Sequence, residues 1–218
     1  GLGLPHVVYA KACDESLFGN MPFGNAICSR FPIAESDSIV MESTEADALL
    51  GNQIRDFADS RCAVWANITV GAAITVCTTH LDHKAEELRV KQMNQCLAAL
   101  PNSAALVCGD FNTFQRSDHA DEAWTKIVDF YQSRGWGVPA ETSLVLDALR
   151  SAGFHDAHSL TPHGGSLPEL TCWTHNPLFR IDHCFLSETL RSKAEVVDYR
   201  RLDSDASDHY PLVLDFDI

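Results

Sequence analysis

The chain has 218 residues and a mass of 24.0 kDa, so we expect residues 1–218 to form one globular domain. Its 45% hydrophobic and 21% charged content is typical of a folded protein and excludes a disordered chain. No apolar run approaches the roughly 20 residues that span a bilayer, and no segment typical of a secretory leader opens the sequence. A net charge of -14 argues against a broad basic surface for binding nucleic-acid phosphates.

The eight cysteines do not indicate a disulfide framework, because none of them forms a C-x-x-C pair. Cys28, Cys77, Cys108 and Cys184 lie in apolar, strand-like runs, where a free cysteine behaves as a small hydrophobic residue. Disulfides persist mainly in oxidising compartments, so we expect reduced thiols and an intracellular location, in the cytoplasm or nucleus. We also expect a monomer.

The first part of the chain is predicted to form short strands separated by turns. These strands are expected at residues 6–12, 25–29, 38–41, 61–68 and 73–79. Gly19-Asn20 and Pro22 predict a turn between the first two strands. Gly71 separates the last two, which we expect to pair as a hairpin.

Beyond residue 84 the apolar residues take a helical period. Helices are expected at residues 85–100, around 124–131 and at 143–152, ended by Pro101, Gly135 and Gly153 respectively. Further strands are expected at residues 104–108, 180–186, 194–199 and 211–216. Because strands come in pairs with few helices between them, the pattern predicts an α/β sandwich of two mainly antiparallel sheets rather than a doubly wound parallel sheet.

Four short polar segments each lie where a strand is expected to end and a loop to begin. They are Thr79-His80-Leu81-Asp82-His83, Gly109-Asp110-Phe111-Asn112, Arg180-Ile181-Asp182-His183 and Ser207-Asp208-His209-Tyr210-Pro211. Taken singly, Asp110 or Asp208 could simply shape a turn. The four together indicate reactive groups presented at a common rim of the scaffold.

In this order, the segments resemble those of the endonuclease/exonuclease/phosphatase superfamily, the DNase I-like metal-dependent phosphoesterases. Residues 24–33 are similar to an early strand of that family, and the resemblance extends over about residues 23–214. It implies a four-layer α/β/β/α sandwich of two mainly antiparallel sheets. It also implies a role for each matching residue.

By this resemblance, His80 contacts the scissile phosphate, Asp110 orients or deprotonates the attacking water, and Asn112 donates to phosphoryl oxygens. These are groups that phosphodiester cleavage requires, since it needs an in-line water and neutralised non-bridging oxygens. The same matching makes all three catalytic.

The remaining matches complete the implied site. Asp182 would orient a catalytic histidine or assist the leaving group, and His209 would bind the phosphate and stabilise its developing charge. Asp208 would lie at or near the metal. An oxygen-rich set without thiolates favours Mg²⁺ or Mn²⁺ over structural zinc.

One part of the family pattern has no match. The family begins with a strand carrying an Asn and continues to a strand ending in a Glu, the principal metal ligand. Neither Glu15 nor Glu35 stands in such a context. The sequence therefore predicts a domain that is N-terminally incomplete and lacks this ligand.

Five further residues are candidates for substrate binding, each with a structural alternative. They are Asn25, Arg30, His183, Arg180 and Trp173, of which the arginines could contact phosphate and the tryptophan could stack on a base or pack internally. The acidic composition favours a small phosphodiester, a sugar or lipid phosphate, or a short nucleic acid over long duplex DNA.

We therefore predict a Mg²⁺- or Mn²⁺-dependent phosphoric ester hydrolase, with phosphodiesters favoured. Two alternatives stay open at this point. One is a catalytically silent binding module of the same fold. The other is a metallo-β-lactamase-type hydrolase, whose His-x-His-x-Asp-His motif matches residues 78–83 except that Thr78 replaces the first histidine.

Overall fold

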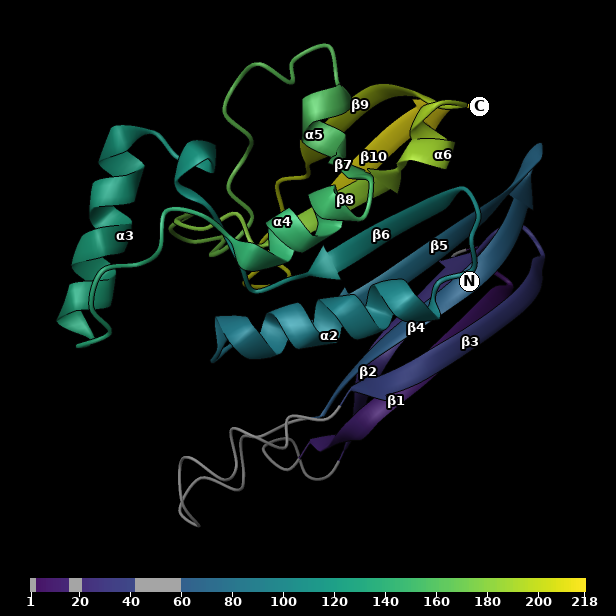
Figure 1. Cartoon of the computed structure of the whole chain (residues 1–218), viewed down its shortest axis with the longest axis horizontal. Helices are drawn as coiled ribbons and strands as arrows, with labels where there is room; N and C mark the ends of the chain where they lie inside the picture. The colour runs from purple at the N-terminus through teal and green to yellow at the C-terminus, as the bar shows by residue number, and fades with distance from the viewer. Residues whose placement is uncertain (1–2, 16–20, 42–59) are drawn as a thin grey trace.

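The computed structural model describes residues 3–15, 21–41 and 60–218 (Figure 1). Its centre is a six-stranded sheet in the order β3-β4-β5-β6-β8-β7. Neighbouring strands are antiparallel except β5 and β6, which are parallel. The strands are β3 (Ile33–Met41), β4 (Arg61–Val70), β5 (Ala72–His80), β6 (Ala105–Asp110), β7 (Phe154–Asp156) and β8 (Asp182–Ser187).

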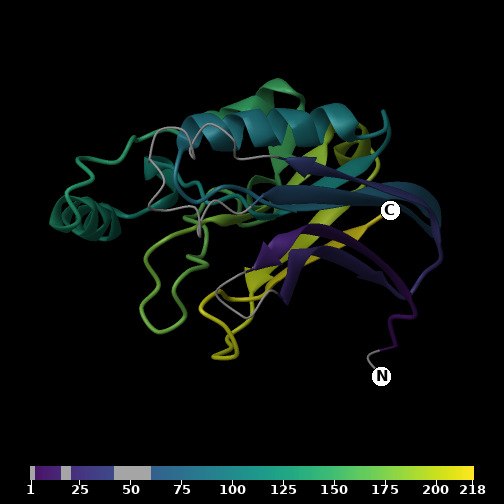
Figure 2. The same ribbon diagram turned by 90° about the horizontal axis from the view of Figure 1, so that it is seen from below.

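Two antiparallel hairpins cover one face of this sheet (Figure 2). One pairs β1 (His6–Glu15) with β2 (Met21–Ser29), and the other pairs β9 (Glu195–Arg201) with β10 (Leu212–Asp217). Every second side chain of β4 packs against the β1–β2 hairpin. In the same way, every second side chain of β5, β6 and β8 packs against the β9–β10 hairpin. The predicted α/β sandwich of mainly antiparallel sheets is confirmed.

Helices cover the opposite face of the six-stranded sheet. The helices α2 (Glu86–Ala99) and α4 (Leu144–Ser151) lie on that face (Figure 2). Their apolar sides pack against Val107 and Phe185. Helix α3 (Asp121–Ser133) lies farther out and packs on an aromatic cluster that includes Phe179. The short segments are η2 (Arg116–Asp118), α5 (Ala157–Leu160) and α6 (Glu188–Arg191).

Most predicted elements are present, with boundary differences that have local reasons. Ser143 caps α4 by accepting a hydrogen bond from the backbone N–H of Leu146. Pro22 lies inside β2 rather than in a turn, which an edge strand tolerates, whereas Gly19-Asn20 falls outside the described residues. The elements β7, α5 and α6 have only three or four residues each, too few to show a period in the sequence.

The outer faces of the hairpins carry exposed apolar side chains, among them Val7 and Tyr9 of β1 and Val197 of β9. These three side chains are accessible to solvent in the described structure.

Within the described residues no disulfide joins any two of the eight cysteines, and five of them are buried. Cys28 differs from the expectation, because it is exposed on β2. Among the described helices, none is both long and apolar enough to cross a membrane.

Candidate active site

Strand register brings three of the predicted residues into one row. His80 ends β5, Asp110 ends β6 and Asp182 begins β8, and their Cα atoms are direct partners across the ladders. Cys108 and Cys184, two residues away on their strands, pack toward the β9–β10 hairpin. Since every second side chain on a strand shares a face, the row also points to the hairpin side. It thus lies at one rim, between the two layers.

Side-chain contacts draw His209 into this row from the loop between β9 and β10. His80 Nε2 lies 3.3 Å from Asp110 Oδ2, and His209 Nδ1 donates to Asp182 Oδ2 over 2.8 Å. Ligand atoms of Asp110, Asp182 and His209 all lie within 4.8 Å of one another. An isolated antiparallel β-bridge between the backbones of His209 and Cys172 holds this loop in place. The structure thus brings together His80, Asp110, Asp182 and His209.

The Gly-Asp-Phe-Asn segment has a backbone that fixes Asp110. At Gly109, where φ is +142°, a Cβ would lie 1.9 Å from the carbonyl oxygen of Thr79, so only glycine allows β5 and β6 to approach here. Phe111 is fully buried and anchors the turn. Asn112 has φ +50°, donates its backbone N–H to Asp110 Oδ1 at 2.8 Å and its side-chain amide to the carbonyl of Leu81 at 3.0 Å. Asn112 therefore lies beside the row.

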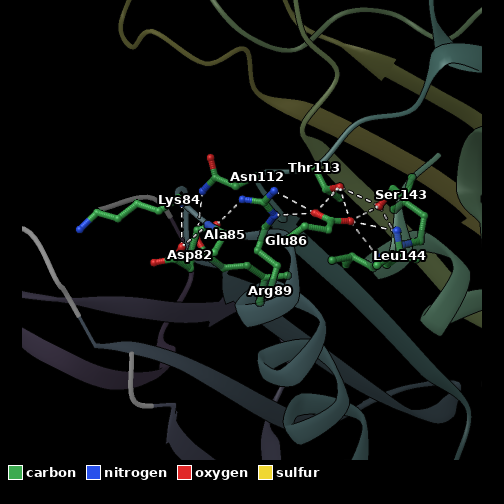
Figure 3. Close-up of polar contacts among 12 residues, drawn as sticks. Asp82, Lys84, Ala85, Glu86, Arg89, Asn112, Thr113, Ser143 and Leu144 are labelled. Atoms are coloured by element: carbon green, nitrogen blue, oxygen red, sulfur yellow. Dashed lines mark hydrogen bonds and ion pairs between the residues drawn. The ribbon is translucent and has the colours of Figure 1, made fainter. Parts of the chain in front are cut away.

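The loop after His80 is held at the start of α2 (Figure 3). Asp82 Oδ1 accepts from the backbone N–H groups of Lys84 and Ala85, at 2.7 and 3.0 Å, and so shapes the turn that leads into α2. Asp82 is buried in this position and is not among the groups that could share a metal. Within the described residues, the zinc motif of a metallo-β-lactamase is thus not assembled.

Glu86 connects that loop to α4 and to the turn after β6 (Figure 3). Its carboxylate accepts from Thr113 Oγ1, from the Leu144 backbone N–H at 2.9 Å, and from Arg89 Nε at 2.9 Å. Arg89 in turn donates to the carbonyl of Asp82 at 3.1 Å. Three segments that border the rim are therefore locked together, and Arg89 is used in this network.

The electrostatics of the row differ sharply between neighbours. Burial, and then the charge of Asp182, raise the pKa of Asp110 from 3.8 to about 7. The hydrogen bond to Asp182, followed by one to Cys172, raises the pKa of His209 from 6.5 to about 11, so its imidazole is a cation at neutral pH. Burial lowers the pKa of His80 to about 3, aided by the charge of Arg61, so His80 is neutral. Paired carboxylates with a partly protonated member favour an added cation.

The donor set fits the expected metal. The carboxylates of Asp110 and Asp182 are hard oxygen ligands of the type that Mg²⁺ and Mn²⁺ prefer. His209 already uses Nδ1 as a donor to Asp182. The two carboxylates are therefore the residues present that would hold such an ion.

Asp208 is placed differently from the prediction. Its side chain is exposed, and Oδ1 accepts only a long hydrogen bond, 3.3 Å, from Ser207 Oγ. Asp208 does not join the group formed by Asp110, Asp182 and His209. The structure therefore corrects the prediction that Asp208 lies at or near the metal.

His183 and Arg180 also do not reach the rim. His183 faces the helix side, stacked on Phe111, with Nε2 donating to the carbonyl of Thr113 at 3.0 Å. Arg180 is 1% exposed and donates to Asp118 at 2.9 Å and to Asp156 at 2.7 Å. Both predicted substrate contacts are therefore wrong, because each side chain is buried and has other partners.

The three other substrate-binding candidates are spread over the molecule. Asn25 donates its side-chain amide to the carbonyl of Cys62 at 2.8 Å, which ties β2 to β4. Arg30 is exposed and follows the last residue of β2, whereas Phe23, which lies beside His80 at the rim, is near the start of that strand. Trp173 packs in the aromatic cluster on α3. None of them contacts the row of site residues.

Sequence reasoning missed two residues beside the row, Arg61 and Phe23. The Phe23 ring lies edge-on to that of His80, with centroids 5.8 Å apart, and the Arg61 guanidinium lies over the same phenyl ring. One signal could have found Arg61, because it opens the strand that precedes the β5 segment ending in His80.

Comparisons with known proteins identify the family and the fold of the chain. The family model described as Endonuclease/Exonuclease/phosphatase family matches residues 3–209. Among curated proteins, none matches the chain. Solved structures of other proteins share its fold.

An endonuclease/exonuclease/phosphatase family protein from Bacteroides thetaiotaomicron has a TM-score of 0.62 and 19% identity, covering 98% of this chain and 76% of its own. The mannosyl-6-phosphatase of Bacteroides thetaiotaomicron VPI-5482 has a TM-score of 0.58 and 18% identity, and the match covers 98% of this chain and 78% of that one. The human Nocturnin catalytic domain with bound sulfate has a TM-score of 0.66 and 20% identity, and the match covers 97% of this chain and 71% of that one. These three structures share the fold of the chain. Because the family model matches almost the whole length, the chain belongs to the endonuclease/exonuclease/phosphatase family.

Proposed function

We propose that the chain is a divalent-metal-dependent phosphoesterase that hydrolyses phosphodiesters through attack of an activated water. The observation that carries this proposal is the row formed by His80, Asp110, Asp182 and His209 at one rim. The family to which the chain belongs consists of enzymes acting on phosphoesters, which supports the reaction class.

Each member of the row has a chemical role suited to its environment. Asp110 orients the attacking water and accepts its proton through its carboxylate. Asn112 and neutral His80 provide donors for phosphoryl oxygens. The His209 imidazolium stabilises the negative charge that develops there, and Asp182 keeps that ring oriented and protonated.

Mg²⁺ or Mn²⁺, when bound by Asp110 and Asp182, supplies a further positive charge beside the phosphoryl oxygens. The net charge of -14 favours small phosphodiesters, sugar or lipid phosphates, or short nucleic acids as substrates. We further propose that the protein is a monomer with a single domain and that it acts inside the cell. The absence of disulfides among the described cysteines supports the intracellular location.

The test is hydrolysis of bis(p-nitrophenyl) phosphate and of a short single-stranded oligonucleotide with Mg²⁺ or Mn²⁺. Asp110→Ala and His209→Ala should each lower turnover by about 100-fold or more, because each removes a proton acceptor or a charge-stabilising group. His163→Ala is the matched control, since His163 is an exposed loop histidine. If both site variants keep near-full activity while folded, the proposal is wrong. Inactivity of the folded wild type would favour a binding module.

A further inference from the structure

Arg61 is a buried cation that the mechanism above does not use. Its side chain opens β4 and the residue is only 4% exposed. Within residues 3–15, 21–41 and 60–218, no carboxylate forms an ion pair with it, and its Nε has no hydrogen-bond partner. A guanidinium in such a place carries an unbalanced charge out of water.

Comparison with Arg180 shows how this chain treats a buried guanidinium elsewhere. Arg180 is equally buried, but two carboxylates, Asp118 and Asp156, accept its hydrogen bonds. A buried charge of this kind is tolerated when paired and strongly unfavourable when alone. The position of Arg61 therefore calls for an anion that binds from outside the described residues.

The partner that does contact Arg61 orients it without neutralising it. Arg61 Nη2 donates to His83 Nδ1 over 3.1 Å, and because a guanidinium can only donate, that nitrogen of His83 is an unprotonated acceptor. Burial, and then the charge of Arg61, lower the pKa of His83, which keeps the ring neutral. The full positive charge of Arg61 thus stays available.

The location of Arg61 connects it to the proposed reaction centre. β4 lies next to β5 in the sheet, and Ala63 pairs with Thr79, so Arg61 lies at the rim just beyond His80. Its guanidinium carbon is 5.6 Å from the centre of the Phe23 ring, which in turn meets His80 edge-on. The rim therefore carries a cation at each flank, Arg61 on one side and His209 on the other.

We propose that Arg61 binds a second anionic group of the substrate, a phosphate adjoining the scissile phosphoester, and so makes the enzyme selective for phosphoesters with a further phosphate. This inference rests on the proposed function. The planar fork of arginine suits two phosphate oxygens at once. Neighbouring strands are about 4.8 Å apart, and β5 lies between the strands of Arg61 and Asp110, so the backbones of these two residues are about 10 Å apart. The long side chain of Arg61 spans part of this distance, so its guanidinium can reach a phosphate next to the one beside Asp110.

The kinetic test compares two substrates that differ only in that phosphate. These are the dinucleotide thymidylyl-thymidine and the same dinucleotide with a 5′-phosphate, each with Mg²⁺ or Mn²⁺. The wild type should prefer the phosphorylated form in kcat/KM. Arg61→Met should abolish this preference, with a loss on the phosphorylated form that exceeds the loss on the other by about 10- to 100-fold, mainly through KM. Arg61→Lys should keep part of it. Arg191→Met, which removes an exposed arginine, is the matched control.

A binding test separates failure of this inference from failure of the proposed function. Inorganic pyrophosphate is titrated calorimetrically into the folded protein in EDTA, where no hydrolysis occurs. Wild type and Arg191→Met should bind it, whereas Arg61→Met should bind at least about tenfold more weakly. Equal losses on both dinucleotides, or unchanged pyrophosphate binding, would overturn the role of Arg61. A wild type that binds pyrophosphate but cleaves neither dinucleotide would contradict only the hydrolase. If Arg61→Met does not fold, Arg61→Lys must still show weakened pyrophosphate binding.

Discussion

Asp110→Asn should make the protein more stable at alkaline pH while removing its activity. The folded chain holds the Asp110 proton up to a pKa of about 7, whereas the unfolded chain releases it near 3.8. The stability from this group is therefore fully present below pH 3.8 and is lost as the pH rises through about 7. The asparagine side chain has the same shape, stays neutral, and can still accept from the Asn112 backbone N–H.

The size of the effect follows from the gap between the two pKa values. At about 1.4 kcal/mol for each pH unit, a gap from 3.8 to about 7 corresponds to about 4 kcal/mol of unfolding free energy above pH 7. The Asp110 side chain is 16% exposed, so solvent screening lowers this figure only in part. Between about pH 5 and pH 8, the advantage of Asp110→Asn over the wild type should widen by about 3 kcal/mol.

Urea unfolding in EDTA, followed by tryptophan fluorescence at about pH 5 and pH 8, measures this difference. Added Mg²⁺ should raise the stability of the wild type at the higher pH, because a cation binds the paired carboxylates of the folded state, and should do less for the variant. An advantage of Asp110→Asn that stays constant with pH, or shrinks as the pH rises, would refute the account of Asp110.

Three other changes test separate parts of the structure. Arg180→Met should cost about 3–5 kcal/mol of unfolding free energy in urea, because it leaves two buried carboxylates unpaired; a loss below about 1 kcal/mol would contradict this ion-pair network. Gly109→Ala should cost about 3 kcal/mol or more in the same assay, because the added Cβ would overlap the Thr79 carbonyl oxygen at a positive φ; wild-type stability would show that β5 and β6 are less closely packed. Burial lowers the pKa of His183 to about 4, so the stability that this group contributes should fall by about 3 kcal/mol between pH 6.5 and about 4. The unfolding free energy of the wild type, measured relative to that of His183→Gln, should therefore fall by this amount over that range; a difference that stays constant with pH would contradict the account of His183.

The row of site residues was predictable because strand ends and motif order are local properties. His80, Asp110 and Asp182 each end or begin a strand, and the sheet register then aligns them. Strand alternation also held a signal that would have corrected one prediction. Since Asp182 and His183 are consecutive residues on β8, their side chains face opposite sides of the sheet and could not both point into one substrate pocket.

Other parts of the site depend on contacts between distant segments. The partners of Arg180 lie 62 and 24 residues earlier in the chain, and no local pattern shows that two carboxylates would bury it. Asp208 fits the turn-forming reading that its sequence context also allowed. Arg61 was not among the predicted site residues. It is a candidate because it is buried and has no carboxylate partner in the described structure, and both of these are properties of the folded state.

The most direct test of the central claim is the metal dependence of phosphodiester hydrolysis by the wild-type chain. Protein stripped with EDTA is assayed on bis(p-nitrophenyl) phosphate before and after addition of Mg²⁺, Mn²⁺ or Zn²⁺, beside Asp110→Asn. We expect no cleavage after stripping, restoration by Mg²⁺ or Mn²⁺, and no restoration in the variant, because the carboxylates at the rim are the ligands. Cleavage that survives EDTA, or that returns equally in Asp110→Asn, would contradict the account.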